Sequence, residues 1–488
     1  MPQSGSIALP TQPSESRLPL AVVVGVVLLV AVVNVVGDPL ISLAALVGIA
    51  GAVMVWTRPA YAVTLLLGSF LVTYPWWLQG RGFLTLNNVL GAWLGILMVY
   101  RLFKHRDWAL LDRRELLLMV AIAAVFIVSR ILHRPDDHTM ALVAPLVEGD
   151  QDPARVIINR LIFFVFLLYY VRTPEQVRMI FLLALAMMIA SGFAAISYVL
   201  VGRGFAGYRA RSGLFIQAAG NPNRLALAAI ISIISLWYLT QWLRNSFVTL
   251  IGSLVIAVEV LAVFMTGSRS GVSALVLAAG ILFLDGGLSP RRIALGIIAG
   301  LAAMVLVVQV APEQSLERIS SIPGTESSSD LGAGSVERRG YTAALAFEFA
   351  QRNPLIGVGI GNWEITRFLS DPFHNITPPH SSVLMALAEG GIITLGLYLW
   401  LLVRTLRNFV DSTSILRDTK PGTYLEWMAK SLRASFIVFM ALSLVGDLWL
   451  NILFYWFVGL GVTLARCVLE PDLVQERGTQ PVLSEATA

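Results

Sequence analysis

The chain has 488 residues, of which 57% are hydrophobic and only 13% are charged, and its mean hydropathy is +0.76. These values exclude a water-soluble globular protein of this length and indicate a membrane protein. The formal net charge of +5 is spread over the loops between apolar runs, so we expect no nucleic-acid binding.

About fourteen apolar runs are long enough to cross ~30 Å of hydrocarbon as helices. They lie near residues 19–36, 39–56, 60–77, 84–103, 115–132, 156–171, 175–201, 224–242, 247–266, 271–285, 292–310, 381–405, 432–448 and 450–466. The pattern predicts an all-α polytopic membrane protein with about 12–14 transmembrane helices and one large external loop domain that contains short helices.

These runs divide the chain into five segments. Residues 1–18 are rich in Pro, Ser and Gln and are expected to be a disordered cytoplasmic terminus. The helical bundle occupies residues 19–310 and 381–466, the loop domain occupies 311–380, and 467–488 form a cytoplasmic tail. The first run is interpreted as a span and not as a cleaved signal, because the segment before it carries no net charge and no small-residue cleavage site follows.

Basic residues are divided unevenly between the two sets of loops. One set holds all three lysines and two arginine pairs, namely Lys104, Lys420, Lys430, Arg113-Arg114 and Arg291-Arg292. Because Lys and Arg accumulate in cytoplasmic loops, we expect this set and both termini to be cytoplasmic. The loop domain then lies outside, in a periplasm-like compartment. A cytoplasmic loop is expected over residues 404–433.

The outer loops nevertheless keep arginines. The loop 202–223 contains three of them, Arg203, Arg209 and Arg211, and no acid. It ends at Asn221-Pro222-Asn223, a good start for a helix. The positive end of that helix dipole would lie beside the arginines, which favours binding of phosphate or another anion.

Three charged residues stand in or beside apolar runs. Arg160 either extends to the interface or points into a polar cavity. Glu259 either pairs with a buried partner or lines a path for protons or cations. Arg269 occurs in Thr266-Gly-Ser-Arg269-Ser-Gly271, at the outer start of a helix that Ser270 is able to cap.

The loop domain leads to a histidine at the mouth of a membrane helix. A helix is expected over 338–352, followed by a turn with glycines at 357, 359 and 361. No strand–turn–helix pattern surrounds these glycines, so they are not interpreted as a nucleotide site. The chain re-enters the membrane through Pro378-Pro-His380-Ser-Ser382. His380 is either a general base or an interfacial cap of the helix.

A cluster of His and Asp in the loop 133–158 is the one place that invites a metal site. Its members are His133, Asp136, Asp137 and His138, with an acidic run after them. Their spacing matches no compact ligand pattern, so a solvated loop is favoured and no metal is expected.

Together these features resemble the O-antigen ligase / O-antigen polymerase family of bacterial envelope glycosyltransferases. The resemblance is carried by Arg211-Ser-Gly with Asn221-Pro-Asn223, Thr266-Gly-Ser-Arg269-Ser-Gly271, Arg338 or Arg339 ahead of Pro354-Leu-Ile-Gly357-Val-Gly359-Ile-Gly361-Asn362, and His380-Ser-Ser-Val-Leu followed by Glu389-Gly-Gly391. It covers residues 200–400. The chain departs from the family in having Ser381 where many members have Asn, and in its larger number of spans.

The resemblance implies a GT-C-like fold and a transferase that uses neither metal nor cofactor. Such an enzyme moves a glycan from undecaprenyl diphosphate to lipid A-core or to another glycan, at the periplasmic face of the bacterial inner membrane. It implies that Arg211, Arg269 and Arg160 bind the diphosphate and that His380 activates the acceptor hydroxyl. The substrate-orienting roles then fall to Arg338, Arg339, Asn223 and Glu389.

Two other classes of protein fit parts of the sequence. A transporter of an anionic or lipid-linked substrate would also contain many spans with acids inside the membrane, such as Glu259, Glu389 and Asp447. No internal repeat is visible, however, and the charges gather at the outer face. A non-enzymatic envelope scaffold would tolerate the loss of His380.

Overall fold

The structure is a computed structural model of the whole chain. It describes residues 55–71, 86–108, 111–136, 139, 153–200, 222–286, 333–370 and 379–470. The predicted spans at 19–36 and 292–310, nearly all of the one at 39–56, and the loop 202–221 with Arg211 lie outside these ranges.

Every regular element in the described ranges is a helix. In chain order they are α3 (Pro59–Leu71), α4 (Leu86–His105), α5 (Arg114–Leu132), α7 (Pro153–Tyr170), α8 (Pro174–Leu200), α10 (Pro222–Leu243), α11 (Ser246–Met265), α12 (Arg269–Asp285), α15 (Ala333–Arg352), α16 (Trp363–Ser370), α17 (Ser382–Thr419), α18 (Tyr424–Ser443) and α19 (Ile452–Leu469). Seven of these are long and apolar enough to cross a membrane: α5, α7, α8, α10, α11, α17 and α19. The predicted all-α polytopic architecture is confirmed.

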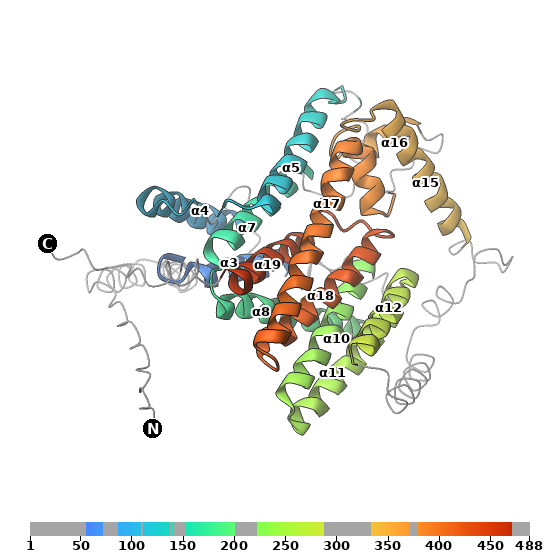
Figure 1. Cartoon of the computed structure of the whole chain (residues 1–488). Coiled ribbons are helices and arrows are strands. Elements are labelled where there is room, and N and C mark those ends of the chain that lie inside the picture. Colours follow the sequence, from blue (N-terminus) through green and yellow to red (C-terminus); the bar gives the residue numbers. More distant parts are fainter. Residues whose placement is uncertain are drawn as a thin grey trace, which may run out of the picture.

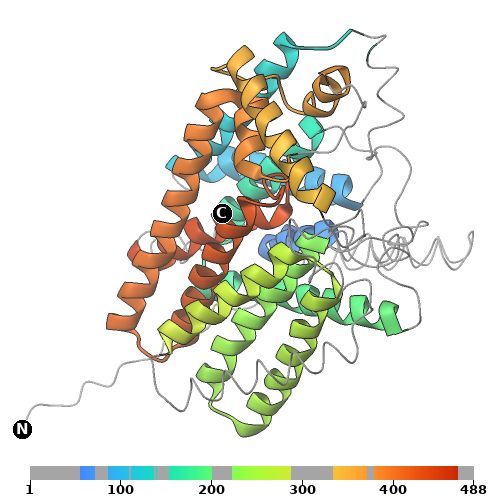
Figure 2. The same ribbon diagram turned by 90° about the vertical axis from the view of Figure 1, so that its right-hand side faces the viewer.

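Helices α10 and α19 lie at the centre of the bundle, and α11 lies at its edge. Within their apolar windows, 78% of α10 and 83% of α19 are buried, against 22% of α11. Figure 1 shows α19 behind the long helix α17, with α10, α11 and α12 forming a group below them. Of these three helices, α10 and α12 pack against α18, and Figure 2 shows the group from the side.

Ion pairs join the helices near the start of α5 and the end of α12 to neighbouring segments. Arg113 before α5 binds Glu470 after α19 at 2.7 Å, and Arg404 of α17 binds Glu115 of α5 at 3.0 Å. Arg433 of α18 binds Asp285 at the last residue of α12. The paired residues lie in or next to segments that the sequence predicts to be on the same side of the membrane. That side is expected to be the cytoplasmic one.

The connection between α17 and α18 differs from the prediction. Instead of a loop over 404–433, α17 continues to Thr419 and α18 begins at Tyr424, so only residues 420–423 lie between them. At the end of its apolar run, Arg404 and Asn408 of α17 both bind the carboxylate of Glu115. A polar contact with α5 therefore holds α17 where hydropathy alone predicts its end.

Helix α17 is broken at Gly391, which has φ 66° and ψ −168°. Residues 354–359, here called the strap, fill the break. Val358 and Gly359 donate backbone hydrogen bonds to the carbonyls of Ala388 and Glu389, each at 2.9 Å. In return, the amides of Ile392 and Ile393 donate to the carbonyls of Pro354 and Leu355. The strap thus satisfies backbone groups that the break would leave unpaired.

Glycines make the strap possible. A Cβ atom at Gly357 would collide with the backbone of Glu389, and one at Gly359 would approach the Cα of Arg130 to 2.6 Å. Gly357 and Gly359 also adopt φ of 65° and 94°, a region that L side chains rarely enter. The Gly-x-Gly-x-Gly run therefore serves close packing against α17 and α5. Figure 1 shows α15 and α16 beside the part of α17 around the break.

Candidate functional site

Two helix starts meet at Asn223 and Arg269. Ser268 caps α12, since its hydroxyl accepts a hydrogen bond from the amide of Gly271 at 3.0 Å. The same hydroxyl donates to Oδ1 of Asn223 at 2.6 Å, and Ser270 donates to that oxygen at 3.1 Å. Two of the predicted site residues are thereby brought together, at the positive dipole ends of α10 and α12.

His380 immediately precedes the start of α17. Ser381 is the N-cap, and its hydroxyl accepts from the amide of Leu384 at 3.3 Å. His380 has φ 50°, an unusual backbone angle for a residue other than glycine. Such conformations persist where the surroundings hold them, and they cluster at functional sites.

The start of α17 is bound to the connection between α18 and α19. The amide and the hydroxyl of Ser382 both donate to the carbonyl of Gly446, at 3.1 and 2.9 Å. The hydroxyl also accepts from the amide of Leu448 at 2.8 Å. Asp447 lies between these two partners, so the backbone contacts bring it to the same end of α17 as His380.

One arginine contacts Asp447, and a second lies near the first. Arg224, in the first turn of α10, has its Nη2 atom 3.5 Å from the carbonyl oxygen of Asp447. Arg160 of α7 is close enough to Arg224 for their charges to interact. It is only 9% exposed, and its guanidinium lies over the ring of Phe70 at 4.1 Å. Arg160 is thus buried among the helices and does not extend into solvent.

These buried polar groups are incompletely satisfied. Among the described residues, Nε and Nη1 of Arg160, Nε of Arg224 and Oδ1 of Asp447 have no hydrogen-bond partner. Buried guanidinium groups normally find acceptors, because burying an unpaired charge is costly. An anion at this position would supply acceptors for both arginines.

Two further carboxyl groups lie near Asp447. Glu364 is in the first turn of α16, and Glu389 lies just before the break in α17. Burial, together with the negative charge of Asp447, raises the pKa of Glu364 to about 7. Burial also raises the pKa of Asp447, and the guanidinium of Arg224 opposes this rise.

Glu389 has an evident structural role. Its Oε1 atom accepts from the amide of Gly361 at 2.7 Å and from the amide of Trp363 at 3.4 Å. The carboxylate therefore holds the first amides of α16, a favourable place for negative charge. Because Glu389 is 1% exposed, it fixes α16 and does not reach an open surface.

The remaining candidates lie elsewhere. Arg339 is exposed on α15, and the side chain of Arg338 and the whole of Arg211 lie outside the described atoms. Glu259 of α11 is fully buried against Gly192 of α8, and in the described part of the chain neither carboxyl oxygen has a hydrogen-bond partner. A buried partner for Glu259 is therefore not seen there.

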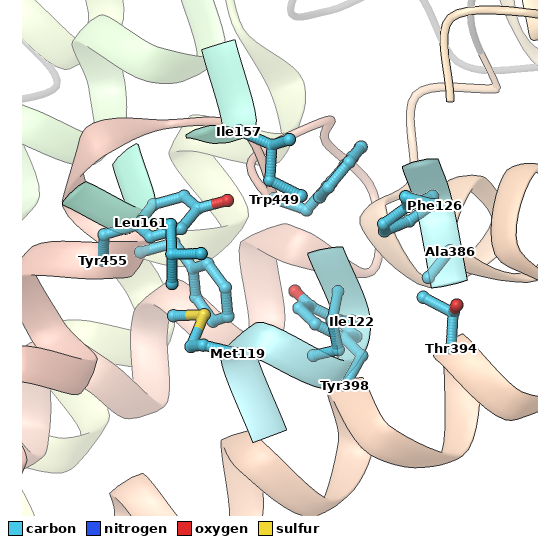
Figure 3. Close-up of a pocket in the computed structure, with 11 residues that line it drawn as sticks. Met119, Ile122, Phe126, Ile157, Leu161, Ala386, Thr394, Tyr398, Trp449 and Tyr455 are labelled. Carbon is cyan, nitrogen blue, oxygen red and sulfur yellow. The ribbon is translucent and has the colours of Figure 1, made fainter. Parts of the chain in front are cut away.

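An apolar crevice adjoins Arg160, because the next residue, Leu161, lines it. Figure 3 shows its wall, with Phe126 and Ile122 of α5 facing Tyr398 and Thr394 of α17. The enclosed volume is only about 10 Å³, so the crevice is closed to a sugar ring. The crevice is therefore not taken as the candidate site.

Residues 254–399 match the family model described as O-antigen ligase. This region of the chain is similar to the O-antigen ligase family. The match runs from α11 into α17, past the break at Gly391, so it includes Arg269, His380 and Glu389 but not Arg160 or Asn223. No curated protein matches the chain. The family supports a membrane glycosyltransferase of the O-antigen ligase type, which acts on lipid-linked glycans and acceptors in general.

Three site residues were not singled out as such from the sequence: Arg224, Asp447 and Glu364. Arg224 stands directly after Pro222-Asn223, so the helix-start argument made for Asn223 also applies to it. Asp447 was noted only as an acid compatible with a transporter. No local pattern could have paired Glu364 with Asp447, because their proximity depends on the packing of α16 against the α18–α19 connection.

Proposed function

We propose that this O-antigen ligase relative transfers a glycan from an undecaprenyl-diphosphate carrier to an acceptor hydroxyl, at the outer face of the bacterial inner membrane. One observation carries the proposal. Arg160, Arg224 and Arg269 gather with His380 at one end of the bundle, where three helices begin. This arrangement suits a reaction that creates negative charge on a phosphate and removes a proton from a hydroxyl.

The arginines would hold the leaving group. When the bond between the anomeric carbon and the diphosphate oxygen breaks, its electron pair passes to that oxygen. Each guanidinium group can donate two parallel hydrogen bonds to a phosphate. Fixed positive charge in a buried site also stabilises the negative charge that develops on the leaving diphosphate. Arg160, Arg224 and Arg269 are assigned this role, and Arg211 is proposed to complete it from the loop before α10.

His380 would act on the acceptor. Its imidazole accepts the proton of the acceptor hydroxyl while the hydroxyl oxygen forms the new bond to the anomeric carbon. The proton therefore passes to His380, and the electron pair of the broken bond passes to the diphosphate. The amide of Asn223, held by Ser268 and Ser270, would orient the donor. Arg338 and Arg339 are proposed to orient a substrate from α15, and Glu389 to do so indirectly by holding α16.

The direct test is transfer from a labelled undecaprenyl-diphosphate glycan by the purified protein in EDTA. We expect His380→Ala and Arg269→Ala each to lower the rate at least about a hundredfold. Arg417→Ala is the control, because Arg417 is 65% exposed near the opposite end of α17. Transfer by His380→Ala at the wild-type rate would remove His380 as the base. If the wild type never consumes the donor, a transporter or scaffold function takes precedence.

A further inference from the structure

A basic surface with exposed aromatic rings lies where α3 begins and α4 ends. Arg101 of α4 donates a hydrogen bond to the carbonyl of Trp56 at 3.0 Å, and the rings of Trp56 and Tyr100 stack with their centroids 5.9 Å apart. These contacts fix the residues before α3 against the last turns of α4. The surface formed by Trp56, Arg58, Tyr100, Arg101 and Lys104 is here called the basic patch.

The basic patch carries positive charge that no neighbouring acid offsets. Arg58 and Lys104 are exposed, and the segments 55–71 and 86–106 contain no Asp or Glu. Asp107, the next acid along the chain, already binds an arginine between α7 and α8 at 3.1 Å. Within the described ranges neither Arg58 nor Lys104 takes part in an ion pair. The patch is therefore suited to bind an anion.

An apolar face of α4 leads into the basic patch. Ile96, Val99 and Phe103 are exposed, and their spacing of three and four residues places them on one side of the helix. Figure 1 shows α4 at the left edge of the described helices. Apolar side chains on the outside of a membrane protein contact acyl chains, and Trp and Tyr rings lie at the level of the headgroups. A ligand with an acyl chain and an anionic headgroup matches both parts of this surface.

We propose that the basic patch binds the headgroup of an anionic phospholipid, with one acyl chain against the apolar face of α4. Arg58, Arg101 and Lys104 supply positive charge for the phosphate diester. Each Lys or Arg near a membrane surface favours an anionic lipid by about fivefold in affinity. Arg101 and Lys104 are three residues apart, so they share one side of α4. This site goes beyond the proposed function and does not depend on it.

The aromatic rings favour an anionic headgroup over choline, which binds to open ring faces. The Nζ atom of Lys104 lies 5.6 Å from the centroid of the Tyr100 ring, and the guanidinium of Arg58 lies 5.8 Å from that of Tyr61. Two rings of this surface therefore already hold cations of the protein. These cations would repel the quaternary ammonium group of phosphatidylcholine.

The basic patch is separate from the candidate site. Helix α3 begins at Pro59 beside the patch, and Phe70 near its other end lies under the guanidinium of Arg160. A helix of this length places its two ends about 18 Å apart. Substitutions in the patch therefore do not touch the arginines of the candidate site.

The experiment is native mass spectrometry of the full chain, purified in detergent, freed of lipid and titrated with palmitoyl-oleoyl phosphatidylglycerol. Phosphatidylcholine with the same chains is the comparison without net charge. We expect the first phosphatidylglycerol to bind at least about tenfold more tightly than the first phosphatidylcholine, because several cations face one phosphate. Thermal melting with each lipid is a second readout, since a ligand of the folded state raises the melting temperature.

Two double variants with the same change in net charge locate the site. Arg101→Gln/Lys104→Gln should lower the affinity for phosphatidylglycerol more than about tenfold and leave that for phosphatidylcholine unchanged. Arg417→Gln/Lys420→Gln removes two exposed cations at the end of α17 and should bind phosphatidylglycerol like the wild type. Lys104→Gln alone keeps the contact between Arg101 and Trp56 and should lose about fivefold. It decides the matter if the first double variant does not fold.

Selective loss of phosphatidylglycerol binding in the patch variants would support the proposal. Equal affinity of the wild type for the two lipids would overturn it. An equal loss in both double variants would mean that overall charge, and not the basic patch, selects the lipid. Displacement of phosphatidylglycerol by an equal concentration of inorganic phosphate would assign the patch to a free phosphate and not to a lipid. Wild-type affinity in a folded Lys104→Gln protein would also exclude the proposed site.

Discussion

The hydroxyl of Ser268 donates a hydrogen bond to Oδ1 of Asn223 while accepting one from the amide of Gly271. One side chain thus caps α12 and orients the first turn of α10. The two hydroxyl donors on Oδ1 fix which way the amide of Asn223 is turned.

Replacement of Ser268 tests this double role. Ser268→Ala should lower the free energy of unfolding by about 1 kcal/mol through loss of the cap and should also slow transfer, because Asn223 loses its strongest support. Thermal melting in detergent and the transfer assay measure the two effects. The control is Ser273→Ala, whose exposed hydroxyl donates only to the carbonyl of Arg269. Equal behaviour of the two variants would contradict the assigned role.

Arg160 offers a test of the diphosphate site from the membrane interior. Arg160→Gln should raise the KM for the donor at least about tenfold, corresponding to about 1.4 kcal/mol. Arg160→Lys keeps the charge but loses the planar fork over Phe70, so its KM should lie between those of Gln and wild type. Arg352→Gln on α15 serves as an exposed control. If the Arg160→Gln protein has the same KM for the donor as the wild type, Arg160 does not bind the donor.

The break in α17 predicts opposite effects for two glycines on one helix. Gly391→Ala forces a side chain onto the backbone of Leu355 at a φ of 66°, so it should destabilise the protein by more than about 1 kcal/mol and abolish transfer. A Cβ at Gly396, five residues on, would meet nothing within 4 Å. Gly396→Ala should therefore be neutral or stabilising by up to about 1 kcal/mol. A Gly391→Ala protein that melts at or above the temperature of Gly396→Ala would show that the strap does not enter the helix as described.

A further test concerns Gly192, on which the buried carboxyl of Glu259 lies. A Cβ at this position would overlap both carboxyl oxygens, and full burial leaves Glu259 little room to move away. Gly192→Ala should destabilise the wild type more than it destabilises a Glu259→Ala protein, with a coupling of about 1 kcal/mol or more in the double-mutant cycle. Gly280→Ala is the control, since its surroundings are open. Additive effects would mean that the two residues do not touch.

Hydropathy and helix-start signals predicted most of the described helices to within a few residues, since burial in lipid demands both a long apolar run and a satisfied backbone. They failed at α17, where the helix continues beyond its apolar run beside Glu115 of α5. The candidate site residues that the sequence proposes, such as Asn223, Arg269 and His380, are ones that stand at helix ends. Arg224, Asp447 and Glu364 escaped because their significance lies in contacts between distant segments, which no spacing in the sequence encodes.

The strap has a consequence for chimeric proteins. Because residues 354–359 complete the backbone of α17 on both sides of Gly391, the loop domain is not a cap that can be exchanged at its two ends. A chimera that takes α15 and α16 from a relative must also take the strap and residues 388–393 from that same relative. Otherwise, backbone carbonyls and amides in the middle of α17 lose their hydrogen-bond partners. The resulting distortion of α17 would then displace His380, which precedes its first turn.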